Sequence, residues 1–291
     1  MDLYQTILSQ QSETIAVLRE AGIACHLTPP GYDDDTMAYL GVFGFFESRR
    51  RAREFGQFPA LEEFEKGYHG IEVGSMRRYF NQELYVALDW EKPLLDIGCG
   101  GTWWKDEYWP RLPKVYGVEV VPEVLLALRH AFPDVRKYHL IYSPTGLTEL
   151  TSESLPQILS SSVIGYILPK QAECHLKECW RLLEPGGRLF LVRINACRYR
   201  GFLRAGLSEI DGRPGSFNYS YRKNDLFRLL ARCCPGHSVE VYRRMGFLLP
   251  HVSAVAIQKL YSLSVRRVVD RAVNRVFPFL SIHHFVVLRK C

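Results

Sequence analysis

Apolar and polar residues follow two different patterns along the chain, and the change comes near residue 90. Before it, apolar residues recur at helical spacing, as they do over 3–21. After it, short apolar runs alternate with amphipathic segments. The pattern predicts a helical cap over 1–88 and a second domain over 89–291.

Five short apolar runs in the second region predict β-strands, because each is short and ends at turn-forming residues. The segments between them predict helices, among them 122–132, which opens with Pro122 in its first turn, and 169–187, which ends at a Pro-Gly-Gly turn. Strands that alternate with helices form a parallel sheet covered on both faces. The predicted strands are 93–100, 114–121, 135–143, 157–167 and 188–194.

The C-terminal part adds two predicted strands, 238–247 and 283–290, and helices at 223–234 and around 252–276. The two late strands would form a hairpin at one edge of the sheet. The fold class predicted is therefore α/β: a doubly wound, Rossmann-like sheet, mostly parallel with an antiparallel edge strand, and an N-terminal helical cap.

Composition narrows the class of protein. The 291 residues are 47% hydrophobic and 23% charged, and the net charge of +6 is too mild to indicate nucleic-acid binding by itself. No basic segment followed by an apolar one marks a signal peptide, and no apolar run is long enough to span a membrane. The eight cysteines lack zinc or disulfide spacing. We expect a cytoplasmic protein with reduced thiols and no metal.

The segment LLDIGCGGTWW, over 94–104, places an acid and a glycine cluster directly after an apolar run. Asp96 lies in that run, and Gly98, Cys99 and Gly100 follow it. Because glycine costs conformational entropy, such a cluster indicates that the backbone must come close to a ligand. Ligands of doubly wound sheets bind beyond the carboxyl ends of the strands, which is where this loop is predicted to lie.

A second acid, Glu119, ends the next predicted strand roughly 20 residues after Asp96. At that spacing a carboxylate binds the ribose hydroxyls of a nucleoside cofactor. A dinucleotide would also need small residues at the start of the following helix, where its pyrophosphate binds. Trp103 and Trp104 occupy that place. The sequence therefore favours a nucleoside without a diphosphate.

These motifs resemble, in order, those of the class I S-adenosylmethionine-dependent methyltransferases. The run D-I-G-C-G-G is similar to the first motif and GVEVVPEVL, over 117–125, to the second. LPQILSSSVIGYI over 155–167 is similar to the fourth-strand motif, and ECWRLLEPGGRLFLV over 178–192 to the segment that leads into the fifth strand. The resemblance covers about residues 90–291. It implies an enzyme with S-adenosylmethionine as its cofactor.

The resemblance also implies roles for individual residues. Glu119 would bind the ribose hydroxyls, and Val120 would lie against the adenine. The acid that the family often has near the end of its third strand is absent from 142–146, so Ser143 or a backbone carbonyl would replace it. The implied cofactor-binding residues are Asp96, Gly98, Cys99 and Gly100 along the methionine part and the sugar, Glu119, Val120 and Ser143, and Ser160 and Ser161 near the sulfonium.

Methyl transfer from a sulfonium is an in-line displacement, so the protein positions a nucleophile and removes its proton where one must leave. Tyr166, after the fourth predicted strand, and His69, in a glycine-flanked loop of the cap, are the candidate bases. Each also has a structural interpretation: a phenol packed at the sheet edge for Tyr166, and an ordinary loop histidine for His69.

The acceptor would be selected by the cap and by an insertion over 198–223 that is rich in Arg, Gly and Tyr. These residue types suit an anionic or phenolic small molecule, methylated on oxygen or carbon in a biosynthetic pathway. The basic amphipathic segment 264–277 would pack its valines on the sheet or on a second subunit in a homodimer, or contact an anionic membrane surface.

Two other interpretations stay open. A member that keeps the fold for binding or assembly, without methylating, fits the missing third-strand acid and Pro156, which stands where an acid commonly opens the fourth strand. An RNA methyltransferase is less favoured, because the chain has no recognisable RNA-binding module and no Asn-Pro-Pro-aromatic motif.

Overall fold

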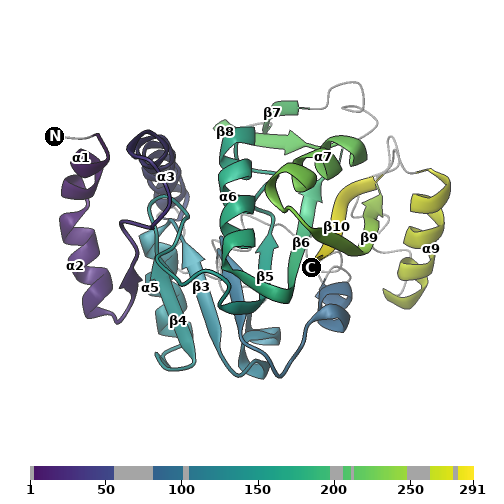
Figure 1. The fold of residues 1–291 in the computed structure, drawn as a ribbon, viewed down its shortest axis with the longest axis horizontal. Helices are drawn as coiled ribbons and strands as arrows, with labels where there is room; N and C mark the ends of the chain where they lie inside the picture. The colour runs from purple at the N-terminus through teal and green to yellow at the C-terminus, as the bar shows by residue number, and fades with distance from the viewer. Residues whose placement is uncertain are drawn as a thin grey trace. The chain divides into compact units, whose positions relative to one another are not determined.

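The chain forms two compact units in the computed structural model, which describes residues 3–55, 81–100, 105–196, 206–210, 213–247, 263–277 and 281–291. The first unit comprises Met1–Tyr68, Asp89–Ile158 and Arg181–Glu184. The second comprises His69–Leu88, Leu159–Trp180 and Pro185–Cys291. Figure 1 labels most helices and strands of both.

Eight strands form one sheet in the order β1-β4-β3-β2-β5-β6-β10-β9. Pairing is parallel between β1 and β4, β4 and β3, and β3 and β2, and antiparallel on both sides of β10. The predicted doubly wound sheet with an antiparallel edge is confirmed. The strands are β1 Ala24–Cys25, β2 Leu94–Ile97, β3 Val115–Glu119, β4 Tyr138–Tyr142, β5 Leu155–Ser161, β6 Leu183–Asn195, β9 His237–Phe247 and β10 Ser281–Lys290.

The core of the first unit is made by β2, β3 and β4 with helix α5, Pro122–Ala131. All four residues of β2 are buried, and α5 contributes Val124, Leu125 and Leu128. Strands of a parallel sheet are covered on both faces, which explains why these runs are continuously apolar in the sequence. The helix begins at Pro122, as predicted, because its fixed φ suits the first turn.

The N-terminal part of the first unit contributes a strand as well as helices. The helices are α1 Leu3–Gln10, α2 Ser12–Glu20 and α3 Asp34–Phe55, and α2 and α3 both contact α5. In Figure 1 these purple helices stand beside α5 and β4. The strand β1 pairs in parallel with the end of β4, through Ala24 opposite Ile141. The sequence did not predict it, since two residues carry no measurable alternation.

The second unit contains helices α6 Pro169–Leu182, α7 Lys223–Cys233 and α9 Leu263–Val276, and a separate antiparallel pair, β7 Gly206–Ile210 and β8 Arg213–Ser220. The helix predicted over 169–187 ends at Leu182, and β6 begins there. Pro185 is the reason, because proline disfavours helical geometry in itself and in the residue before it. The antiparallel pair β7 and β8 lies within the predicted 198–223 insertion.

Helix α9 is tied to its own unit by ion pairs. The buried carboxylate of Glu83 lies 3.1 Å from the Arg271 guanidinium of α9 and also pairs with Arg243 of β9. Part of the basic surface predicted over 264–277 is therefore engaged within the chain. Among the helices that the structure describes, none combines the length and the apolar character that a membrane crossing needs.

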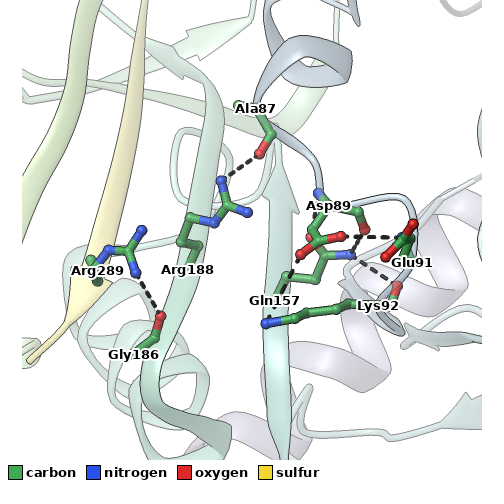
Figure 2. Close-up of polar contacts among 8 residues, drawn as sticks. All are labelled: Ala87, Asp89, Glu91, Lys92, Gln157, Gly186, Arg188 and Arg289. Carbon is green, nitrogen blue, oxygen red and sulfur yellow. Dashed lines mark hydrogen bonds and ion pairs between the residues drawn. The ribbon is translucent and has the colours of Figure 1, made fainter.

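Side-chain bonds fix the chain just before β2 (Figure 2). In the first unit, the Gln157 amide donates to the carbonyl oxygens of Asp89 and Lys92, at 2.8 and 3.1 Å, and accepts from the Asp89 N–H. In the second unit, the Arg188 guanidinium donates to the Ala87 carbonyl at 2.8 Å, at the end of a helix, where cations stabilise the last carbonyls. The Gln157 bonds position the entry into the strand that leads to the glycine loop.

Candidate functional site: a glycine loop between two buried carboxylates

The loop after β2 requires glycine at two positions. Gly98 and Gly100 have φ of +68° and +62°, in the left-handed region that residues with a Cβ rarely adopt. The N–H groups of Gly98 and Cys99 both donate to the Val118 carbonyl at 2.9 Å, which bends the loop across the end of β3. The glycine cluster noted in the sequence thus has a conformational cause.

Glu119 is held against this loop by backbone donors. Its side chain is buried at the end of β3, where one carboxylate oxygen accepts from the Gly100 N–H and the other from the Val120 N–H, each at 2.8 Å. Hydrogen bonds to ionised acceptors are among the strong ones in proteins. The structure therefore brings together the two motifs that the sequence placed at the ends of neighbouring strands.

Asp96 lies under the loop in a fully buried polar cluster. Its Oδ2 accepts from the Tyr108 hydroxyl and from the Trp109 indole N–H at 3.2 Å, and lies 3.7 Å from the Lys105 ammonium. Its Oδ1 is buried and has no hydrogen-bond partner within the described ranges. Burial raises the pKa of Asp96, while Lys105 and the Tyr108 hydrogen bond act against that shift. One oxygen of this carboxylate is thus left for a further donor.

Lys105 supports the glycine loop from the inside. Its side chain is fully buried, and its ammonium donates to the Cys99 carbonyl as well as pairing with Asp96. It lies on the first of two 3₁₀ turns, Lys105–Glu107 and Trp109–Arg111, at the end of the loop. Sequence reasoning missed Lys105, Tyr108 and Trp109. No pattern marks Lys105 as buried, because lysine is almost always exposed.

The loop after β4, residues 143–147, closes upon itself. Ser143 is fully buried, and its hydroxyl donates to the Leu147 carbonyl. Its N–H donates to the Glu119 carbonyl at 3.1 Å, which connects this loop to the end of β3. Val120 is half-buried at that point. The structure therefore brings Ser143 and Val120 next to Glu119, but uses the Ser143 side chain inside its own loop.

The remaining candidates lie in the second unit or outside the described residues. The Ser160 hydroxyl is buried and lies 2.8 Å from Nε2 of His175 on α6, and Ser161 is half-buried. Burial lowers the pKa of His175 to about 4, so this imidazole is neutral at physiological pH. Tyr166 is 43% exposed. His69 falls outside the described residues, as do Trp103 and Trp104.

His175 also lies 3.7 Å from the Cys179 thiol, one helical turn further along α6. The described part of the chain brings no group of three or more His, Cys, Asp or Glu side chains together in a way that could hold a metal ion. His175 therefore takes part in a buried polar contact between α6 and β5, through the Ser160 hydroxyl.

A family model and two solved structures are similar to parts of this chain. Residues 95–191 match the model described as a methyltransferase domain. An S-adenosylmethionine-dependent methyltransferase from Mesorhizobium loti is 17% identical, with a TM-score of 0.51 over 72% of this chain and 96% of that one. A SAM-dependent methyltransferase from Methanosarcina mazei is 15% identical, with a TM-score of 0.50 over the same shares. These likenesses confirm the Rossmann-like methyltransferase fold.

Curated relatives match over a shorter stretch. The human mitochondrial ubiquinone biosynthesis O-methyltransferase is 30% identical over 107 residues, which are 35% of this chain and 28% of that protein. The rat protein of the same name is 26% identical over 121 residues, which are 40% and 34% of the two chains. The matched stretch thus spans about a third or less of each relative.

Proposed function

Residues 95–191 carry a methyltransferase domain built on the class I fold, and from that premise we propose that the protein transfers the methyl group of S-adenosylmethionine to a small molecule. The observation that carries the proposal is the glycine loop between Asp96 and Glu119. Two left-handed glycines let its backbone approach a ligand, and buried carboxylates stand at both of its sides.

The residues present fit the cofactor. Oδ1 of Asp96 is a buried acceptor that lacks a partner among the described residues, as expected where a donor of the ligand's methionine part belongs. A carboxylate accepts about four hydrogen bonds, so Glu119 can hold the loop and also accept from two ribose hydroxyls. S-Adenosylmethionine would supply a methyl group activated by its sulfonium charge. The chain's task is then to align the acceptor and to keep water out.

The acceptor is proposed to be an oxygen of a small biosynthetic molecule, with carbon as the alternative. The names of the curated relatives favour oxygen, since all are O-methyltransferases of ubiquinone biosynthesis. An anionic or phenolic acceptor suits the Arg and Tyr content of the 198–223 segment. Tyr166, which follows β5 and is exposed, stays the candidate base among the described residues.

Calorimetric titration with S-adenosylmethionine and S-adenosylhomocysteine tests the cofactor site. We expect the wild-type protein to bind both, and Glu119→Ala to bind at least about tenfold more weakly, because the ribose acceptor and the loop anchor are lost together. Glu91→Ala is the matched control, since Glu91 is an exposed acid of the same unit. Wild-type protein that binds neither nucleoside would contradict the proposal.

A further inference from the structure

Helix α3 makes direct backbone contact with the loop after β4. Gly44 is buried at this point, and a Cβ built on it would meet the Pro144 carbonyl oxygen well inside the 3.0 Å below which real Cβ atoms essentially never come. The obstacle is backbone and cannot rotate aside. With any other residue at 44, the helix or the loop would have to move by about 1 Å.

The N-terminal segment also holds both ends of that loop. At its start, the His26 N–H donates to the Tyr142 carbonyl at 2.9 Å. At its end, one carboxylate oxygen of Glu149 accepts from the N–H groups of Leu27 and Thr28, at 2.7 and 2.8 Å. The Glu149 N–H donates in turn to Nδ1 of His26 at 3.0 Å. The N-terminal segment therefore forms hydrogen bonds with residues 142 and 149, on either side of the loop, and contacts the loop backbone at residue 144.

The other side of the loop faces the residues proposed to hold the nucleoside. The Ser143 N–H donates to the Glu119 carbonyl, and a Cβ on Gly146 would lie 3.9 Å from Cγ1 of Val120, which is ordinary contact. The loop has no acidic side chain, and both of its hydroxyls are bonded within it: Ser143 donates to the Leu147 carbonyl, and Thr145 accepts from the Leu147 N–H at 3.3 Å. The groups of this loop that recognise a base must then be backbone N–H and C=O groups. Their directions depend on the conformation of the loop.

We propose that the N-terminal segment positions this loop as the base-binding wall of the cofactor site, with Gly44 as the principal positioning residue. The inference rests on the proposed function, because it concerns the adenine end of the same ligand. It assigns base selectivity to backbone groups of 143–147 that α3 and residues 26–28 hold in place, and it makes the N-terminal helices part of the cofactor site.

Two glycines on the same helix provide the test and its control. Gly44→Ala pushes on the loop backbone, whereas Gly41→Ala meets a ring carbon of Tyr4 at 2.6 Å, on α1. Binding of S-adenosylhomocysteine and of its inosine analogue is measured for wild type and both variants, with thermal unfolding as the measure of stability. The ratio of the two dissociation constants reports base selectivity, which a loss of stability alone does not change.

For Gly44→Ala we expect affinity for S-adenosylhomocysteine to fall by about tenfold or more, and the preference over the inosine analogue to shrink. For Gly41→Ala we expect the wild-type preference to persist, even where unfolding shifts to lower temperature. If Gly44→Ala does not fold, Glu149→Ala decides, since it removes the clamp on Leu27 and Thr28 from an exposed position. It should reduce the same preference.

The outcomes separate this inference from the function on which it rests. Wild-type protein that binds neither nucleoside would overturn both. Wild-type protein that prefers adenine, together with Gly44→Ala and Glu149→Ala variants that keep this preference, would overturn the positioning role and leave the cofactor site intact.

Discussion

The loops after β2 and β4 belong to one unit and are proposed to bind one ligand, yet different parts of the chain hold them. The loop at 98–100 is held from nearer along the chain, by the carboxylate of Glu119 and the ammonium of Lys105. The loop at 143–147 is held by residues a hundred or more positions away, in α3 and beside β1. The first loop therefore has a recognisable sequence motif, whereas the conformation of the second depends on contacts with distant residues.

The largest expected effect comes from breaking the support of the first loop. Lys105→Met leaves the buried Asp96 carboxylate without its cation, and we expect a loss of about 3–5 kcal/mol in the free energy of unfolding. Lys92→Met is the control, because its pair with Asp89 is solvent-exposed and should matter by less than about 1 kcal/mol. Urea unfolding measures both. Equal losses would show that the buried pair does not hold the loop.

Acid should act on the second unit through two buried histidines. Burial lowers the pKa of His175 and of His284 to about 4, so the unfolded chain binds more protons between pH 6.5 and 4. Stability should therefore fall as pH falls through that window, by up to about 3 kcal/mol for each histidine. His175→Gln should flatten the measured dependence, and replacing the exposed His130 should not.

Glu119→Gln tests how much of the first loop's geometry depends on charge. The new amide group would face one of two backbone N–H donors, at Gly100 or Val120, and we expect a loss of about 1–3 kcal/mol. Chemical denaturation measures the loss, with Glu91→Gln as the exposed control. A Glu119→Gln variant as stable as the control would mean that the carboxylate is dispensable for the fold.

The smallest effect compares one glycine from each loop. Gly98 and Gly146 have similar left-handed φ, +68° and +73°, so each change to alanine should cost about 1–2 kcal/mol through backbone strain. Gly186→Ala gives that strain alone, since its φ is +80° and a Cβ there meets open space. Thermal unfolding of the three variants should agree. A much larger loss at one of the loops would reveal a steric contact in addition to strain.

Local patterns predicted the parts of the fold that local forces determine. The buried runs of β2, β3 and β4, the helix after Pro122 and the glycine loop all follow from spacing and from backbone preference. Helix α6 ends at Leu182, earlier than the predicted 187, because Pro185 disfavours helical geometry in the residue before it. The alternation of strands and helices predicted a mostly parallel sheet, but it did not predict the order of the strands.

Contacts between distant parts of the chain left no readable pattern. Nothing in the residues around Gly44 shows that its neighbour is Pro144, and a two-residue strand such as β1 has no periodicity to detect. The burial of Lys105 contradicts the usual behaviour of its residue type. The bond from the Ser143 hydroxyl to the Leu147 carbonyl, at a position that the resemblance implies for an adenine ligand, also has no sequence signal.

The pairing of β1 with β4 bears on the order in which the molecule folds. Ala24 and Ile141 join across more than a hundred residues, and closing so long a segment costs entropy that only later contacts recover. During synthesis, residues 24–28 emerge well before Glu149, so the hydrogen bonds of Leu27 and Thr28 to Glu149 form only later. The wall after β4 is therefore completed late, and until then the newly made chain lacks one wall of the proposed cofactor site.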